Sequence, residues 1–196
     1  MHWNKLAPGL ALTLALLGCS GSSDGAPSDG AAMSGDAATA GSDAGLGLLK
    51  VTSSAFVEAG VLPVEHTCDG AGLSPPLAFG GAPAGTKEFA LLATTLARDG
   101  LKWSWVLYSI PANTTMLAKG SMGVGKAGLT SDGPALAYSP PCSQGPGAKT
   151  YTFTVYALSA SPALPAMANQ VTGAVLTSAI SGITLGSGQI NVSSTR

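Results

Sequence analysis

Charged side chains are scarce in this chain of 196 residues, since only 10% are Asp, Glu, Lys or Arg and the formal net charge is -1. A nucleic-acid-binding surface needs a dense patch of Lys and Arg, and a coiled coil needs regularly spaced charges beside its apolar seam. We therefore expect no nucleic-acid partner and no long coiled coil. The 27 Gly and 13 Pro instead predict many turns between short structural elements.

Metal-binding and nucleophilic residues are also few. The chain has three Cys and two His, none at the CxxC or HxxxH spacing of a metal site, and no Gly-x-Ser-x-Gly motif. After removal of an N-terminal signal, His66 is the only imidazole, and Asp69 follows it three residues later. A hydrolase that uses His66 is the weakest hypothesis. We expect no cofactor, no metal and no catalytic residue, and a structural role for His66.

The N-terminus has the pattern of an export signal. Lys5 precedes an apolar run, Leu6–Leu17, which is too short to span a bilayer. The run ends in Leu16-Leu17-Gly18-Cys19, which resembles a bacterial lipobox. Residues 1–18 are therefore predicted to be a lipoprotein signal peptide, with Cys19 as the lipidated N-terminus; the alternative is an ordinary signal peptide with an incidental Cys. Because Ser20 is not Asp, we favour the outer membrane of a bacterial cell envelope over the inner one.

The next segment, residues 19–47, predicts a tether. It consists almost entirely of Gly, Ala, Ser, Thr and Asp, with no aromatic and no basic residue. Such a composition buries too little apolar surface to offset the entropy lost on ordering. A flexible chain of this length has a typical span of roughly 30 Å. We expect a single folded domain over residues 48–196.

Two cysteines remain after lipidation, Cys68 and Cys142. Both lie in turn-rich stretches, and an exported protein resides in an oxidising compartment. We predict a disulfide between them, which closes a loop of about 73 residues and stabilises the fold by at most roughly 4 kcal/mol. The alternative is two separate buried thiols.

Alternating apolar patterns and short apolar runs predict strands over residues 88–95, 103–110 and 149–158. In the second of these, strict alternation places Trp103, Trp105, Leu107 and Ser109 on one face and Ser104, Val106, Tyr108 and Ile110 on the other. Helical spacing predicts a helix within residues 165–180, followed by a short strand over residues 189–192. The expected fold class is mainly β, a two-sheet antiparallel β-sandwich with one or two short C-terminal helices.

Several short motifs resemble a known family. They are His66-Thr67-Cys68-Asp69-Gly70, Leu73-Ser74-Pro75-Pro76-Leu77, Trp103-Ser104-Trp105-Val106, Tyr138-Ser139-Pro140-Pro141-Cys142 and Tyr151-Thr152-Phe153-Thr154-Val155. In this order they resemble the bacterial, Raf-kinase-inhibitor-like branch of the phosphatidylethanolamine-binding proteins. The resemblance extends from about Val51 to the C-terminus. It implies a two-sheet β architecture with a C-terminal helix near a ligand pocket.

The resemblance also implies a small anion-binding pocket, whose acidic and His-containing motifs are changed here. The Asp-Pro-Asp-Ala-Pro motif falls on Thr95-Leu96-Ala97-Arg98-Asp99, which keeps neither pocket aspartate unless Asp99 takes the place of one. The His between two tryptophans falls on Ser104. The His-Arg-Tyr motif falls on Lys149-Thr150-Tyr151 and keeps only the Tyr.

The predicted ligand-binding residues come from these motifs and from the Tyr138–Cys142 stretch: Thr95, Ser104, Trp105, Tyr138, Pro141, Lys149 and Tyr151. Hydroxyl groups and one cation, without a carboxylate, favour a phosphate or carboxylate ligand. The leading hypothesis is thus a membrane-anchored, non-enzymatic binding lipoprotein with a diverged pocket for a small anion or phospholipid headgroup. The alternative is a protein-interaction module, protease- or kinase-inhibitor-like, in which Thr95 and Ser104 pack into a filled pocket.

Overall fold

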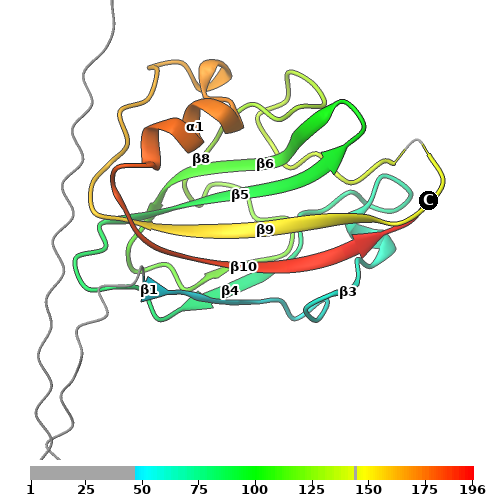
Figure 1. The fold of residues 1–196 in the computed structure, drawn as a ribbon, viewed down its shortest axis with the longest axis horizontal. Coiled ribbons are helices and arrows are strands. Elements are labelled where there is room, and N and C mark those ends of the chain that lie inside the picture. Colours follow the sequence, from blue (N-terminus) through cyan, green and yellow to red (C-terminus); the bar gives the residue numbers. More distant parts are fainter. Residues whose placement is uncertain (1–46, 144) are drawn as a thin grey trace, which may run out of the picture. The chain divides into compact units, whose positions relative to one another are not determined.

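Two β-sheets form the framework of the computed structural model, which describes residues 47–143 and 145–196 (Figure 1). The larger sheet has the strand order β1 (Gly47–Leu48), β10 (Thr184–Ser194), β9 (Lys149–Leu158), β5 (Glu88–Ala97), β6 (Gly100–Pro111) and β8 (Lys126–Ala127), and β3 (Gly60–Val61) also pairs with β10. The smaller sheet has the order β2 (Lys50–Thr52), β4 (Leu77–Gly80) and β7 (Met116–Leu117). The predicted signal peptide, Cys19 and the predicted tether up to residue 46 lie outside the described residues.

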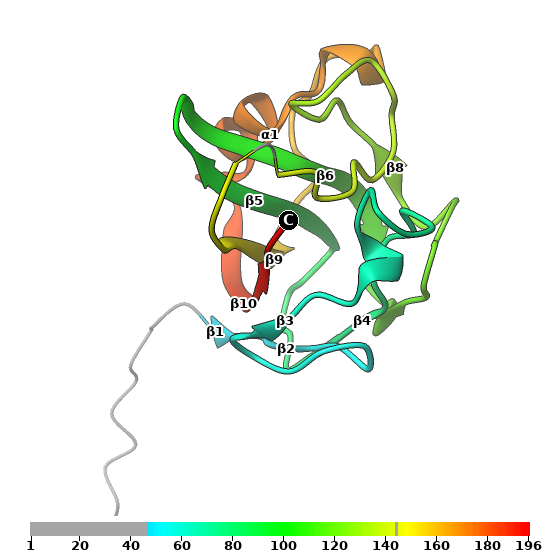
Figure 2. The same ribbon diagram turned by 90° about the vertical axis from the view of Figure 1, so that its right-hand side faces the viewer.

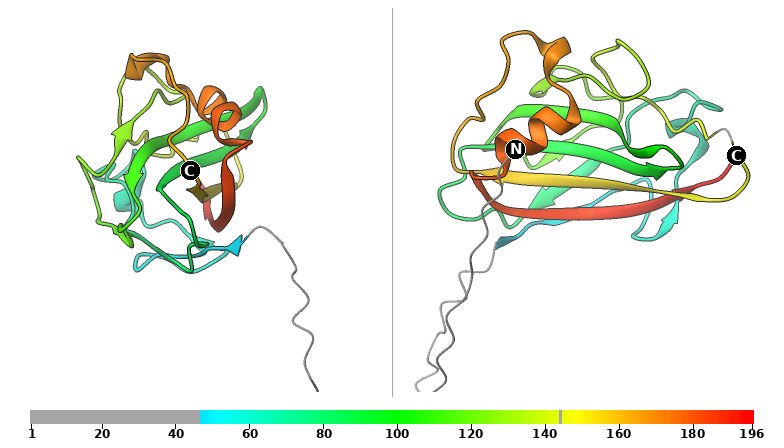
Figure 3. Two further views of the ribbon diagram at one scale, coloured as in Figure 1. Left: turned by 90° about the vertical axis from the view of Figure 1, so that its left-hand side faces the viewer. Right: turned by 45° about the horizontal axis from the view of Figure 1, so that its top comes forward.

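The larger sheet is covered on both faces (Figure 2). Between the two sheets lies a core that includes Phe79 of β4, Leu91 of β5 and Phe153 of β9. On the opposite face, helix α1 (Gly173–Ile180) packs Leu176 and Ile180 against the larger sheet. Figure 3 shows α1 lying across the strands on this side. Two short 3-10 helices, η1 (Val64–His66) and η2 (Ala168–Gln170), complete the elements.

The predicted fold class is confirmed. Strands β5, β6, β9 and β10 form an antiparallel ladder, and the C-terminal part contains one α-helix. The pairing is not antiparallel throughout, because the two-residue strands β1 and β3 both run parallel to β10. The alternation predicted for β9 is also confirmed, since Tyr151, Phe153, Val155 and Ala157 all face the core between the sheets.

Two C-terminal elements differ in length from the prediction. The helix begins only at Gly173, because Thr172 caps it by accepting a hydrogen bond from the Val175 N–H at 3.2 Å. The strand predicted over residues 189–192 extends over 11 residues as β10, because it pairs with β9 along nearly its whole length. Its glycines lower its intrinsic strand propensity, so tertiary pairing decides its length.

The predicted faces of β6 are wrong in part, because two register shifts interrupt the alternation. Trp105 pairs with Ala93 and Trp103 with the next residue of β5, Thr94, so Ser104 is the extra residue of a β-bulge. As a result Trp103 packs on the α1 side of the sheet, whereas Trp105 lies in the core between the sheets. A second shift near Ser109, which has a φ of 53°, returns Ile110 to that core.

Candidate functional site

A cavity of about 380 Å3 opens at the end of the larger sheet where β5 finishes and β6 and β9 begin. We call it the charged cavity. Six residues of these strands line it: Thr95, Ala97, Lys102, Ser104, Lys149 and Tyr151. The remaining wall comes from Asp132 and from the loop of residues 139–143.

Strand register explains why these side chains converge. Thr95 of β5 is the direct partner of Lys102 on β6 and of Tyr151 on β9, so these residues form one row across three strands. Cross-strand partners point to the same face of a sheet. Ser104 joins this row because the β-bulge displaces it from the alternation of its neighbours. Its hydroxyl donates to the Ala93 carbonyl at 3.4 Å, and the Thr95 hydroxyl donates to the Thr150 carbonyl at 2.8 Å.

Two cations and one anion lie on the cavity wall. Lys149 is half-buried and forms no ion pair among the described residues, whereas Lys102 lies 2.6 Å from Asp99 of the β5–β6 turn. Asp99 itself does not line the cavity, so it does not replace the family's pocket aspartates. The absence of a carboxylate predicted from the sequence is wrong, because Asp132 also lines the cavity and accepts from the Ser139 hydroxyl at 2.9 Å.

Tyr151 is a neutral hydrogen-bond donor at the floor of the charged cavity. The side chain is only 4% exposed, and burial together with the nearby charge of Asp132 raises the pKa of its hydroxyl. Its hydroxyl forms no hydrogen bond with another described residue. Ser143 also lines the cavity, is 8% exposed, and has a buried hydroxyl without a partner in the described part of the chain. Both hydroxyls are therefore available to a ligand.

The predicted disulfide is confirmed and holds one rim of the charged cavity. Cys68 and Cys142 are bonded, with their α-carbons 5.3 Å apart. The Cys68 N–H also donates to the Pro141 carbonyl at 3.1 Å. The C-terminal Arg196 lies beside this bond, with its guanidinium 3.3 Å from the Cys142 sulfur and 3.2 Å from an Asp69 oxygen. This rim is thus fixed by one covalent bond and several polar contacts.

Trp105 and Tyr138, predicted to bind the same ligand, lie elsewhere. Their rings meet edge to face with centroids 5.5 Å apart, and both line a second cavity on the inner side of β6. The bulge places Ser104 and Trp105 on the same side of β6, but the Trp105 ring packs in the core between the sheets and lines the second cavity. The predicted set therefore divides: Thr95, Ser104, Pro141, Lys149 and Tyr151 line the charged cavity, and Trp105 and Tyr138 do not.

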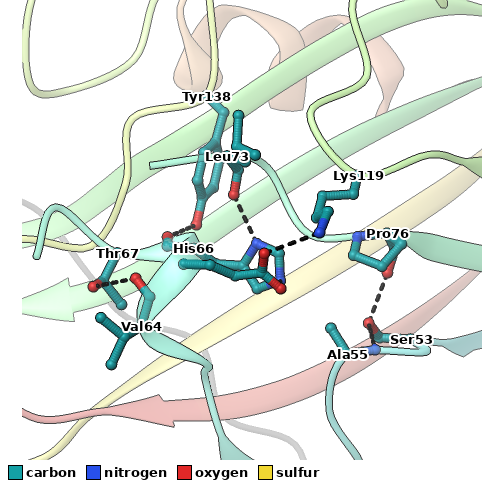
Figure 4. Close-up of polar contacts among 10 residues, drawn as sticks. Ser53, Ala55, Val64, His66, Thr67, Leu73, Pro76, Lys119 and Tyr138 are labelled. Carbon is teal, nitrogen blue, oxygen red and sulfur yellow. Dashed lines mark hydrogen bonds and ion pairs between the residues drawn. The ribbon is translucent and has the colours of Figure 1, made fainter. Parts of the chain in front are cut away.

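His66 has structural contacts, as predicted. It is fully buried, and its Nδ1 lies 2.8 Å from the Leu73 carbonyl oxygen (Figure 4). Its own carbonyl accepts from the Tyr138 hydroxyl at 2.8 Å, and its Nε2 lies 3.5 Å from a Glu65 oxygen. Glu65 in turn pairs with Lys119 at 3.0 Å. These contacts join the segment of η1 to two distant loops.

Sequence reasoning did not select four polar residues that line the charged cavity: Lys102, Asp132, Ser139 and Ser143. For Lys102 a signal existed, because a tight β5–β6 hairpin pairs it with Thr95. No local pattern identifies the other three, which lie in irregular loops. Within the described residues, no cluster of His, Cys, Asp and Glu is suited to hold a metal ion. No described helix has the length and hydropathy needed to cross a bilayer.

The fold and the charged cavity together define a β-sandwich protein of the ligand-binding type. The family model described as "Phosphatidylethanolamine-binding protein" matches residues 52–195. The chain therefore belongs to the phosphatidylethanolamine-binding protein family, which confirms the resemblance seen in its motifs.

Relatives in bacteria agree with this assignment. A lipoprotein-named relative, LppC of Mycobacterium tuberculosis, is 33% identical over 181 residues, which cover 89% of each chain. A UPF0098 protein of Chlamydia muridarum is 33% identical over 56% of this chain and 76% of its own. Among solved structures, the phosphatidylethanolamine-binding protein homologue CT736 of Chlamydia trachomatis has a TM-score of 0.69 and 26% identity, covering 76% of this chain and 99% of that one. YbcL of E. coli, at 24% identity and a TM-score of 0.68, shares the fold.

Proposed function

We propose that this protein is a membrane-anchored, non-enzymatic binding lipoprotein whose charged cavity takes a small phosphorylated polar group, such as a phospholipid headgroup. The observation that carries the proposal is the convergence of Thr95, Ser104, Lys149 and Tyr151 in one open cavity. A filled pocket would instead favour a protein-interaction module.

The charges on the cavity wall support this ligand class. Lys149 forms no ion pair among the described residues and acts on Asp99 only through the longer-range attraction of their charges, so its ammonium group can bind a phosphate oxygen. The hydroxyls of Tyr151 and Ser143 supply neutral donors to the same group. Asp132 supplies an anion in the same lining, which suits an amine at the other end of the ligand. A zwitterion such as phosphoethanolamine matches both charges.

Anchoring is supported by the lipobox at Cys19 and by the relative named as a lipoprotein. The described chain begins at β1, where Gly47 pairs with Gly186 of β10, whereas Lys149 pairs with Ser194. These positions on β10 are eight residues apart, or about 26 Å along a strand. Figure 1 shows β1 and the C-terminus at opposite ends of the sheet. The described chain thus begins at the end of the sheet away from the charged cavity, in what we propose is a protein of the cell envelope and of its outer membrane.

A non-catalytic role fits the chemistry of the cavity. Its lining contains hydroxyls, two lysines and one aspartate, but no imidazole and no free thiol among the described residues. The buried His66 uses its Nδ1 for the Leu73 carbonyl and does not line the cavity. General acid–base catalysis most often uses a histidine at the substrate, and no histidine among the described residues lines this cavity.

The test is calorimetric titration of the chain from residue 20 onward with phosphoethanolamine and with inorganic phosphate. The fold covers 99% of the solved chain of CT736, so a chain of little more than this domain has been solved as a folded protein. We expect saturable binding by the wild type and about tenfold weaker binding by Lys149→Ala, the loss of one charge-assisted hydrogen bond. Lys50→Ala, which removes an exposed lysine of β2, is the matched control and should bind like the wild type.

Absence of binding at millimolar concentrations by wild type and Lys149→Ala alike would exclude the ligand proposal. Ser104→Trp, which fills the cavity, separates the two hypotheses. Loss of phosphoethanolamine binding in this variant supports the binding protein. A protein partner that is still captured by Ser104→Trp, with no headgroup bound by the wild type, favours the interaction module.

A further inference from the structure

The second cavity, which we call the apolar cavity, has a volume of about 280 Å3 and lies on the inner side of β6. Its floor is formed by Trp105 and Leu107, which are 2% and 7% exposed and belong to the core between the sheets. Its walls include Tyr138, Leu136 and Val124. The hydrophobic core therefore opens to the surface at this point.

Two polar groups of the walls are already engaged in hydrogen bonds within the protein. The Tyr138 hydroxyl donates to the His66 carbonyl at 2.8 Å, outside the cavity (Figure 4). The Gly120 N–H donates to the Ser74 carbonyl at 2.9 Å, and both residues belong to the lining. None of the described lining residues carries a charge. A charged ligand would lose its hydration there without a compensating partner, which is costly.

The outer wall is the glycine-rich loop that precedes β8. Gly125 has a φ of 76°, and a Cβ atom there would lie 2.7 Å from the Tyr108 carbonyl oxygen, so the loop approaches β6 as closely as only glycine allows. At the mouth, Met122 is 85% exposed, and Leu73 and Leu136 are each 40% exposed. These exposed apolar side chains surround one concave opening, which is typical of a binding site for an apolar molecule.

We infer that the apolar cavity binds a neutral, compact hydrophobic molecule of one or two fused rings. An engineered apolar cavity of ~150 Å3 binds benzene, so a space of about 280 Å3 suits a bicyclic molecule. The edge-to-face pair of Trp105 and Tyr138 offers an aromatic surface to such a ring. This site is separate from the charged cavity, and its ligand is independent of the proposed headgroup.

The test is an NMR titration of the chain from residue 20 onward with indole, a neutral bicyclic probe, and with indole-3-acetate, its charged counterpart. We expect saturable indole-induced shifts at the Trp105 ring N–H and at the amides of Gly123 and Gly125. Indole-3-acetate should bind at least tenfold more weakly. Indole shifts that are absent, or that map to Thr95, Lys149 and Tyr151 instead, would overturn the inference.

Two variants test the location. Ala127→Phe places a ring in the cavity, because Ala127 lines it and packs against the core between the sheets. It should weaken indole binding at least tenfold, and Ala118→Phe, at an exposed position, should change it less than twofold. Met122→Asp, at the exposed mouth, should weaken indole binding severalfold without affecting the fold. Wild-type affinity in folded Met122→Asp and Ala127→Phe would contradict the site. Phosphoethanolamine binding at Lys149 should be unchanged in all three variants. The proposal for the apolar cavity can therefore be disproved without affecting the proposal for the charged cavity, and the reverse also holds.

Discussion

Gly173 opens helix α1 directly above the ring of Trp103. A Cβ atom at Gly173 would overlap this ring, so the helix approaches the sheet more closely than alanine permits. Alanine is normally the better helix former. We predict that Gly173→Ala nevertheless lowers the free energy of unfolding by about 1–3 kcal/mol, because overpacking outweighs the gain in helix propensity. Urea denaturation measures this change.

Gly182→Ala is the matched control, since no atom lies within 4 Å of the Cβ it would add. Its unfolding midpoint should differ little from that of the wild type. If Gly173→Ala proves as stable as Gly182→Ala, the close packing of α1 on Trp103 is not a constraint on this fold.

At the scale of single residues, the sequence predicted the charged cavity well where regular strands position the side chains. Thr95, Lys149 and Tyr151 lie on the same face of adjacent strands, so their motifs were sufficient to bring them together. Trp105 was misplaced because it was chosen as a neighbour of Ser104 in the motif, which does not show that its ring packs into the core between the sheets. Asp132 was missed because it lies in a loop whose path is decided by long-range contacts.

Among the elements, β3 is held to the sheet by an acidic side chain. The two carboxylate oxygens of Glu58 accept from the backbone N–H and the side-chain amide of Asn191 in β10, both at 2.8 Å. The hydrogen bond from the Asn191 backbone N–H is the larger cause, and the one from its side-chain amide the smaller, of a pKa of Glu58 below its ordinary value of 4.5. A carboxylate with a lowered pKa stabilises the fold above its ordinary pKa, and this contribution is lost as the pH falls through the lower, folded-state pKa.

We predict that Glu58→Gln lowers the Tm at pH 7 by about 3 °C, because one acceptor is replaced by a donor that faces an N–H group. Below about pH 4 the difference from the wild type should shrink, since Glu58 itself becomes protonated there. Thermal unfolding followed by circular dichroism between pH 3 and pH 7 provides the measurement. A Tm difference that is the same at every pH would show that the charge of Glu58 plays no part.

At the scale of elements, periodicity was a good guide to the long strands and a poor one to their ends and irregularities. β9 alternates without interruption and was predicted with its correct faces. In β6 the bulges at Ser104 and near Ser109 depend on pairing with β5, which no local pattern encodes. The helix was predicted too long because apolar spacing continues upstream of Thr172, the residue that caps α1.

Over the whole molecule, segments far apart in the sequence meet around the charged cavity. The loop after η1 and the loop before β9 are joined by the disulfide, across a sequence separation of 74 residues. The Tyr138 hydroxyl and the Cys68 N–H add two further links between the same loops. Cysteine counting identified this connection because the predicted lipidation of Cys19 would leave a single pair. Counting cysteines could not show that this pair borders the charged cavity, because the position of Cys142 at the rim depends on the path of the loop through Pro141.

The disulfide therefore has two measurable roles, in stability and in ligand binding. We predict that the double variant Cys68→Ser, Cys142→Ser unfolds with a free energy lower by up to roughly 4 kcal/mol, because the unfolded chain regains the freedom of a long open loop. It should also bind phosphoethanolamine severalfold more weakly, since Ser143 and Pro141 lose their covalent anchor at the rim. Dithiothreitol should weaken the wild type to the same level and leave the variant unchanged. An unfolding midpoint and an affinity that are both insensitive to reductant in the wild type would show that the hydrogen bonds of the rim suffice without the covalent bond.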